Sequence, residues 1–185
     1  MTANNNFYTI LEDEDTEIRY VFHISDIHIR IFDRHEEYKE VFERTYKKLT
    51  SESKGKEKES IIVLTGDIVH SKTLMGPDLI KLVFDFFSKL INILPVILIA
   101  GNHDCITSNK HRLDALTPII NDIGKYELNN IHYLKETGIY RYKNIIFGLT
   151  DIYTDTCFTA SNITNEIWST YLKKINTKLH YFMDP

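Results

Sequence analysis

The chain has 185 residues, of which 43% are hydrophobic and 26% charged, and this composition suits one folded domain with a buried core. Its two cysteines, Cys105 and Cys157, exclude a disulfide framework, and its apolar runs are too short and interrupted to cross a membrane. The formal net charge of −4 does not indicate a nucleic-acid binder, but it does not exclude one, because phosphate contacts depend on local basic patches.

The N-terminal segment, residues 1–17, is polar and acidic, and it lacks the basic start and apolar run of a signal peptide. We therefore expect a flexible polar N-terminus over residues 1–17, followed by a single domain over residues 18–185. The protein is expected to be intracellular, in the cytoplasm or nucleus, and neither secreted nor bound to a membrane. The abundance of Ile, Asn, Lys and Tyr is typical of an AT-rich genome and suggests a viral source.

The first part of the domain alternates apolar strands with helices. Helices are predicted where apolar residues recur at three- and four-residue spacing, and strands where short runs are apolar throughout. By these criteria, buried strands are expected at residues 20–25, 61–65 and 95–100, helices at 34–49 and 77–91, and a solvated linker at 50–60. Strands that alternate with helices pair in parallel, so the fold class is α/β with helices packed on the sheet.

The second part of the chain has a different pattern, with shorter elements. The expected elements are a helical segment at residues 112–121, a strand at 131–134, a hairpin formed by 139–142 and 145–149, and an amphipathic helix at 163–175.

Three polar clusters follow the three buried strands of the first part. Asp26 and His28 follow the first strand, Asp67 and His70 the second, and Asn102, His103 and Asp104 the third. Ligands bind beyond the carboxyl ends of the strands in open α/β sheets, so we expect these side chains to meet at one edge. Any one cluster alone is typical of a turn or a helix cap, whereas the three in this order favour a metal site.

The donor set of these clusters mixes oxygen and nitrogen atoms. Such a set suits Mn²⁺, Fe or Zn²⁺ better than Ca²⁺. Its negative charge is sufficient for two divalent ions, and two ions about 3.5–4 Å apart are a common device for hydrolysing phosphate esters. The sequence therefore predicts a site for phosphoester chemistry.

The ordered motifs D-x-H, G-D and G-N-H-D resemble those of the calcineurin-like metallophosphoesterases. His70 lies three places after Asp67, and this G-D-x-x-H pattern resembles the Mre11/SbcD-type DNA-repair nucleases within that superfamily. The resemblance implies a sandwich fold with a mostly parallel sheet flanked by helices, present here as a partial domain.

The resemblance also implies a role for each motif residue. Asp26 and His28 would bind one metal ion, Asp67 would bridge two ions, and Asn102 would bind the second. His70, His103 and Asp104 would be catalytic: His103 would contact the scissile phosphate or protonate the leaving oxygen, and Asp104 would orient His103. Mn is the first candidate for both ions, followed by Fe, Zn and Mg.

The chain departs from the family pattern after Asp104. The family completes its site with an isolated histidine and a closing Gly-His-x-His, whereas the histidines that follow here are His111, His132 and His180, each outside such a motif. We expect His111 to be solvated and His132 to be structural, and His180 stays an open candidate ligand. The second metal site is thus expected to be incomplete and the domain truncated at its C-terminus.

The implied function is a metal-dependent phosphodiesterase, an exo- or endonuclease that acts on DNA ends in double-strand break repair or recombination. The implied partners are DNA and an ATPase of the Rad50/SbcC type. Two alternatives stay open at this point. One is a phosphatase or small-molecule phosphodiesterase of the same superfamily, and the other is a catalytically incomplete subunit that binds DNA or a partner.

The helix expected at residues 77–91 is apolar on more than one face, which is more than packing on a sheet requires. The resemblance implies a homodimer, with Leu82, Phe86 and residues 113–120 as candidate contacts. The alternative is that this helix lies between the sheet and a layer outside residues 1–185.

Overall fold

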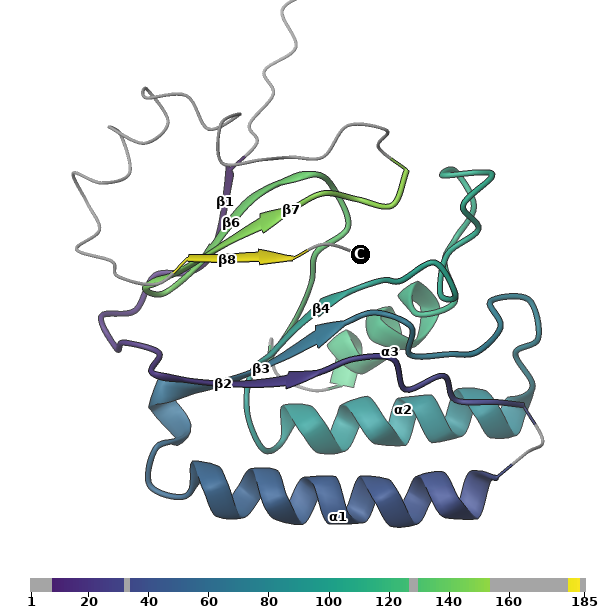
Figure 1. Cartoon of the computed structure of the whole chain (residues 1–185), viewed down its shortest axis with the longest axis horizontal. Coiled ribbons are helices and arrows are strands. Elements are labelled where there is room, and N and C mark those ends of the chain that lie inside the picture. The colour runs from purple at the N-terminus through teal and green to yellow at the C-terminus, as the bar shows by residue number, and fades with distance from the viewer. Residues whose placement is uncertain (1–7, 32–33, 127–129, 154–179, 184–185) are drawn as a thin grey trace, which may run out of the picture.

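Two four-stranded sheets pack face to face, and helices cover the outer face of one of them (Figure 1). The computed structural model describes residues 8–31, 34–126, 130–153 and 180–183. The first sheet has the order β2-β3-β4-β5 and is parallel throughout, with strands Tyr20–Ile24, Ser60–Thr65, Val96–Ile99 and Ile131–Tyr133. The expected parallel α/β arrangement is therefore confirmed.

The second sheet has the order β1-β6-β7-β8. Its strands are Tyr8–Glu12, Gly138–Tyr142, Ile145–Leu149 and His180–Met183. The predicted hairpin is the antiparallel pair β6–β7, while β1 and β8 each pair in parallel with a hairpin strand. The expectation of a flexible segment over residues 1–17 is thus corrected for residues 8–12, because Tyr8–Glu12 is a strand whose backbone pairs with β6.

Helices α1 (His35–Ser53), α2 (Pro77–Ile91) and α3 (Thr117–Tyr126) lie on one side of the parallel sheet (Figure 1). The bounds of α2 match the prediction. Helix α1 continues four residues beyond the predicted end, and a short 3₁₀ turn at Glu57–Glu59 takes up part of the expected linker. Helix α3 begins later than predicted, with Pro118 in its first turn, where a missing N–H removes no helical hydrogen bond.

Strand β3 is buried on both faces because it lies inside the sandwich. Ile62 and Leu64 point toward the helices, while Ile61 and Val63 point toward the second sheet. Burial on both faces explains why this strand is apolar throughout rather than alternating with polar residues.

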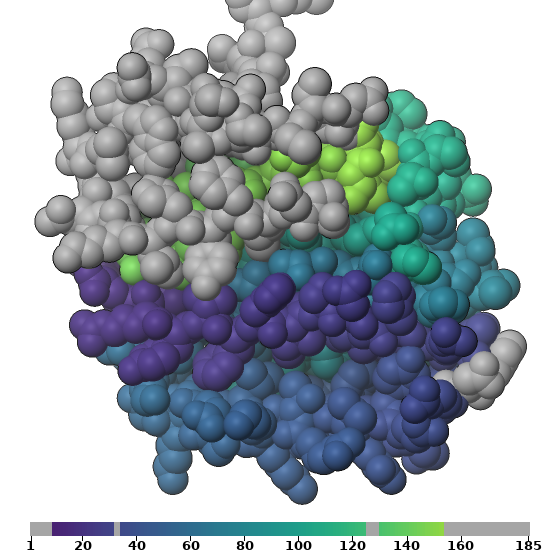
Figure 2. Space-filling model, viewed as in Figure 1, coloured from purple at the N-terminus to yellow at the C-terminus, as the bar shows by residue number. Residues whose placement is uncertain are grey.

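Strand β2 is more exposed than the sequence suggested. It lies at the edge of the parallel sheet, and within the described residues it pairs with β3 alone. Tyr20 is 40% exposed, and Figure 2 shows this part of the chain as a purple band on the molecular surface. The prediction of a strand is confirmed, but that of a fully buried strand is wrong, because position in the sheet is set by long-range pairing.

The apolar character of α2 is explained by its contacts with other elements of the same chain. The helix packs on the parallel sheet beside α1, and the ring of Phe86 is 4.4 Å from that of Phe42, centroid to centroid. Leu82 and Phe86 are 5% and 1% exposed. These two side chains are therefore core residues and offer no dimer surface. Of the other candidates, Leu113 is 68% exposed and Leu116 is buried.

Within the described residues, no helix combines the length and the apolar content that crossing a membrane requires. The helix expected at residues 163–175 and Cys157 lie outside the described residues. Cys105 is buried as a free thiol, and burial raises its pKa to about 11.

Candidate metal centre

The loops that follow β2, β3 and β4 meet at the carboxyl edge of the parallel sheet, as predicted. Backbone hydrogen bonds tie the first loop to the second: Asp26 N–H donates to Gly66 O over 3.3 Å, and His28 N–H donates to Asp67 O over 2.8 Å. Ile29 and Val69 then form a parallel bridge. The first two motifs are thus held side by side by their backbones, independently of any ligand.

The structure brings Asp26, His28 and Asp67 into one group. One donor atom from each lies within 4.8 Å of the other two. His28 Nε2 is 3.8 Å from Asp26 Oδ1 and 3.7 Å from Asp67 Oδ2. Two carboxylates and an imidazole are a fitting set for a divalent transition metal. His28 Nδ1 is buried without a hydrogen-bond partner among the described residues, so this ring has an unused ligand atom.

Three of these residues have a left-handed backbone, which side chains other than glycine seldom adopt. The φ angles are 55° for Asp26, 50° for His28 and 51° for Asp67. Such conformations cost on the order of 1–3 kcal/mol each and cluster at functional sites, where the surroundings hold them in place. Of the five non-glycine residues with positive φ in the described part of the chain, these three belong to the predicted metal site, and the others are Arg34 and Lys143. This concentration supports a functional interpretation of the motifs.

Two glycines allow the second and third loops to approach closely. A Cβ on Gly66 would lie 2.5 Å from Gly101 N, and a Cβ on Gly101 would lie 2.1 Å from Asp67 Oδ1. Gly66 also has a φ of 90°, a conformation for which glycine carries no steric penalty. The glycines that precede Asp67 and Asn102 are therefore required by space, and they place the two motifs in contact.

The buried carboxylate of Asp104 joins these two loops. It accepts hydrogen bonds from the N–H groups of Ile68 (3.3 Å), Val69 (3.0 Å) and Gly101 (2.9 Å). Burial raises the pKa of Asp104 to about 6, although the three hydrogen bonds act in the opposite direction. Asp104 thus fixes the backbone of both loops, whereas the resemblance implied that it orients His103.

His103 is oriented by other groups. Its Nδ1 is 2.7 Å from the carbonyl oxygen of His70, and its backbone N–H donates to Asp67 Oδ1 over 3.0 Å. A hydrogen on Nδ1 leaves Nε2 as the free ring nitrogen. Asp67 is therefore linked directly to the third motif.

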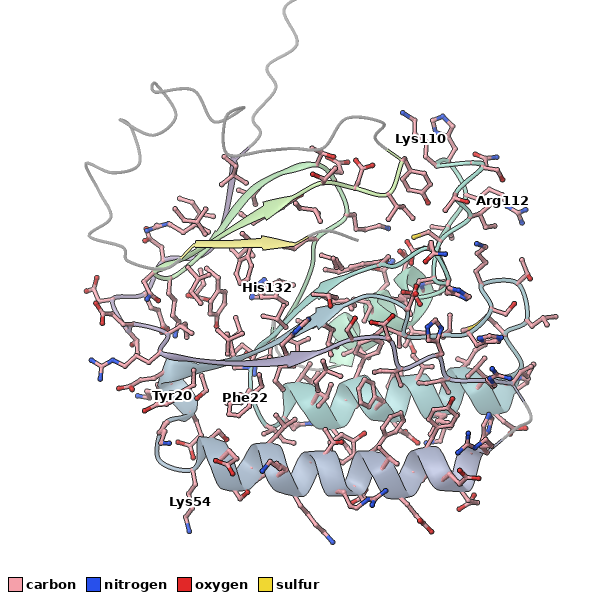
Figure 3. The ribbon with its side chains drawn as sticks, in the orientation of Figure 1. Tyr20, Phe22, Lys54, Lys110, Arg112 and His132 are labelled. Atoms are coloured by element: carbon pink, nitrogen blue, oxygen red, sulfur yellow. The ribbon has the colours of Figure 1, made fainter. Side chains whose placement is uncertain are left out.

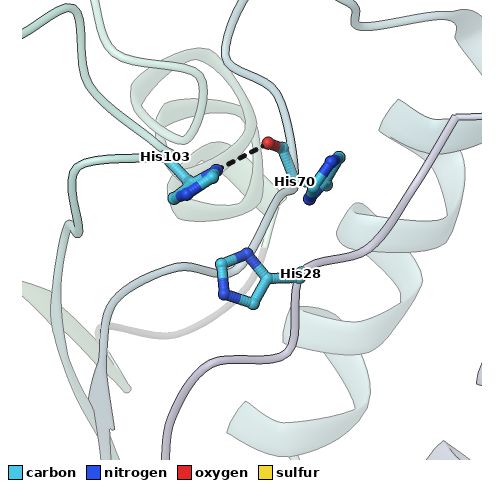
Figure 4. Close-up of side chains that lie close together, drawn as sticks. All are labelled: His28, His70 and His103. Carbon is cyan, nitrogen blue, oxygen red and sulfur yellow. Dashed lines mark hydrogen bonds between the residues drawn. The ribbon is translucent and has the colours of Figure 1, made fainter.

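The rings of His28, His70 and His103 form a second cluster (Figure 4). Their centroids are 4.7 Å apart for His28 and His103, 5.9 Å for His28 and His70, and 5.6 Å for His70 and His103. Burial, together with the positive charges of Arg30 and the two neighbouring histidines, lowers the pKa of His70.

The remaining predicted residues lie as follows. Asn102 is exposed in the third loop, and its backbone carbonyl accepts a hydrogen bond from Lys72 Nζ over 2.8 Å. His132 packs between the sheets, with its ring 5.4 Å from that of Tyr142, and burial lowers its pKa (Figure 3). His111 is exposed in the loop after the third motif, and His180 lies in β8.

The sequence interpretation missed Lys72 and a cleft beside the metal centre. The cleft has a volume of about 590 Å³ and extends from the end of β4 to the end of β7. Its lining includes Lys110, His111, Arg112, Lys135 and Tyr153. Lys110 and Arg112 lie on the loop that follows the third motif (Figure 3). The only sequence signal for this cleft was a run of basic residues at positions 110–112.

A parallel sheet in a β-sandwich, with an Asp/His cluster at its carboxyl edge, defines a metallophosphoesterase domain. The profile of the calcineurin-like phosphoesterase family matches residues 20–182, and the chain belongs to this family. The family binds divalent metals, and the Asp and His groups at the sheet edge fit that chemistry.

A relative from Acanthamoeba polyphaga mimivirus, Uncharacterized protein R555, is 49% identical to this chain over 179 residues. The alignment covers 97% of this chain and 13% of the relative. The chain thus spans a small part of the length of this viral protein.

Proposed function

We propose that this domain belongs to a metal-dependent phosphodiesterase that cleaves DNA at or near its ends, in the manner of the Mre11/SbcD-type repair nucleases. The observation that carries the proposal is the placement of His70 and His103 beside the Asp26–His28–Asp67 group. A phosphate ester bound at a metal ion in the Asp26–His28–Asp67 group would lie beside the imidazoles of His70 and His103.

The chain's own residues divide the work as follows. Asp26, His28 and Asp67 would hold a divalent ion, and bound ions supply positive charge that polarises the phosphate ester. His103 has its Nδ1–H held by the His70 carbonyl, so the doubly protonated ring would be needed for Nε2–H to give a proton to the leaving oxygen. Asp104 keeps the loop backbone rigid while this happens.

Basic side chains at the same edge support a polyanionic substrate. Lys72 lies against the Asn102 carbonyl, and Lys110 and Arg112 line the adjoining cleft. Phosphate contacts of this kind position a nucleic acid without reading its sequence. The cleft also carries Asp114, Glu136 and Asp151, so its charge is mixed. Lys72, Lys110 and Arg112 would act on phosphates within about one Debye length, roughly 8 Å at physiological salt, whatever the formal net charge of −4.

The test is Mn²⁺-dependent cleavage by the natural protein that carries this chain, with linear duplex DNA, closed circular DNA and p-nitrophenyl phosphate as parallel substrates. We expect linear DNA to be cut fastest, and we expect Asp67→Asn and His103→Gln each to lower the rate by about 10²–10⁴-fold. Asp78→Asn is the matched control, because Asp78 is an exposed carboxylate in the first turn of α2.

Two outcomes would replace the proposal. Rapid hydrolysis of p-nitrophenyl phosphate without DNA cleavage would make the domain a phosphatase of the same family. DNA binding without any hydrolysis, in protein saturated with Mn²⁺, would make it a binding subunit.

A further inference from the structure

The three clustered histidines come from three different loops, and each backbone is held in place. His28 N–H donates to Asp67 O over 2.8 Å, His70 N–H donates to Ile29 O over 2.9 Å, and His103 N–H donates to Asp67 Oδ1 over 3.0 Å. One ring nitrogen from each histidine lies within 4.8 Å of the other two. Three imidazoles are therefore brought together by loops whose backbones are mutually fixed.

Two of the three rings also show features of metal ligands. His103 Nδ1 contacts a backbone carbonyl, which is the common partner of the non-ligating nitrogen in metal-bound histidines and leaves Nε2 free. His28 Nδ1 is buried and has no hydrogen-bond partner among the described residues. A buried polar nitrogen without a partner needs an explanation, and a bound ion supplies one.

We propose that His28, His70 and His103 form a three-imidazole site for a single Zn²⁺ ion, and that this site competes with the Asp26–His28–Asp67 site for the shared ligand His28. Three nitrogen donors suit a borderline-soft ion, and a water molecule would complete a tetrahedron. Mn²⁺ prefers the carboxylate set, because its preferred donors are oxygen atoms.

The geometry is compatible with this ion after small side-chain rotations. Zn–N bonds of about 2.1 Å in a tetrahedron place the nitrogens about 3.4 Å apart. The donor atoms are within 4.8 Å of one another, so the largest closure needed is about 1.4 Å, from 4.8 minus 3.4. We expect rotation of the imidazoles about χ1 and χ2 to supply this closure, since hydrogen bonds fix the loop backbones.

Competition follows from the chemistry of imidazole. A neutral imidazole has one lone pair available for a metal, so His28 serves one site at a time. A zinc ion on the three histidines leaves the carboxylate site with Asp26 and Asp67 alone, and it also occupies His103. Zinc is therefore an antagonist of manganese binding in this domain. This proposal does not depend on whether the substrate is DNA or another phosphoester.

The test uses calorimetric titrations of the chain with Zn²⁺ and Mn²⁺, separately and in competition. We expect one Zn²⁺ per chain, and we expect apparent Mn²⁺ affinity to fall in proportion to added Zn²⁺. His70→Gln should weaken Zn²⁺ at least 10-fold and leave Mn²⁺ affinity within about twofold, while Asp26→Asn should do the reverse. His111→Gln, an exposed histidine outside the cluster, is the matched control and should change neither affinity.

A second measurement keeps the test decisive whether or not the variants fold. Co²⁺ in the zinc site of the unmodified chain should give the intense visible absorption of a four-coordinate ion, and Zn²⁺ should displace it. The weak spectrum of a six-coordinate ion would overturn the proposal. So would Zn²⁺ affinity unchanged in folded His70→Gln, or Zn²⁺ and Mn²⁺ that bind together without competition.

Discussion

Replacing Gly101 by alanine tests the close contact between the second and third loops. The added Cβ would lie 2.1 Å from Asp67 Oδ1, 2.5 Å from Asp67 N and 2.8 Å from Asp67 Cγ. Rotating the carboxylate relieves the first contact but not the second, because the amide nitrogen belongs to the backbone. One loop must therefore move.

We expect Gly101→Ala to lower both the stability of the protein and its affinity for Mn²⁺. Forcing an additional methyl group into a packed site costs about 1–3 kcal/mol in the free energy of unfolding. Movement of Asp67 also breaks its alignment with His28 and with the His103 N–H group, so Mn²⁺ affinity should fall by at least the roughly 10–100-fold seen when groups that orient metal ligands are lost.

Urea unfolding followed by circular dichroism measures the change in stability, and calorimetric titration with Mn²⁺ measures the change in affinity. Gly124→Ala is the control, because Gly124 lies in α3 and a Cβ there meets no heavy atom within 4 Å among the described residues. That variant should be more stable by about 0.5–1 kcal/mol, since alanine is the better helix former. Parent-like stability and Mn²⁺ affinity in Gly101→Ala would refute the argument that the glycine is required by space.

Three further predictions concern other parts of the chain. Phe86→Ala should lower the free energy of unfolding by about 3–5 kcal/mol, measured by urea denaturation, because the ring is buried between α1 and the sheet. Asp114 is buried, which alone raises its pKa, but hydrogen bonds from Thr117 and Lys135 lower the pKa below its ordinary value. Because the pKa of Asp114 is lower in the folded state, its ionised carboxylate stabilises the fold fully above about pH 4, and this contribution is lost as the pH falls. Asp114→Asn should therefore flatten the acid side of the curve of unfolding free energy against pH. Residues 1–185 alone should bind one Mn²⁺ in a single dominant calorimetric event and show little nuclease activity. Two equally tight binding events would contradict this expectation. So would Mn²⁺-dependent cleavage of DNA by residues 1–185 that the substitution Asp67→Asn abolishes.

The sequence predicted those parts of the fold that depend on local pattern. The bounds of α2 follow from Pro77 at its start and from a continuous helical period, both of which are local properties. The meeting of Asp26, His28 and Asp67 could be predicted because the motifs follow strands of one parallel sheet, and parallel strands end at a common edge.

Features set by long-range pairing could not be predicted in this way. The sequence showed that α2 is apolar on more than one face, but it did not show that α1 of the same chain packs against it. The sequence interpretation also missed that β1 joins the second sheet, because polar and acidic residues flank Tyr8–Glu12, although four of its five residues, Tyr, Thr, Ile and Leu, suit a strand. The role of Asp104 depends on three backbone N–H groups from two loops, and their positions follow only from the folded structure.

The hydrogen bonds between the motif loops have a consequence that can be tested for the order of folding and metal loading. Asp104 and the backbone contacts of Asp26 and His28 join the loops through hydrogen bonds between groups of the protein. Small metal-dependent domains such as zinc fingers unfold when the metal is removed, because the ion supplies their folding energy. Here a buried core and the hydrogen bonds of Asp104 join the same elements, so we expect a chelator to strip the ions and leave a folded protein that reloads on dilution into fresh metal. The identity of the bound ion is then decided by the supply of metals around the finished protein rather than at the moment the chain folds.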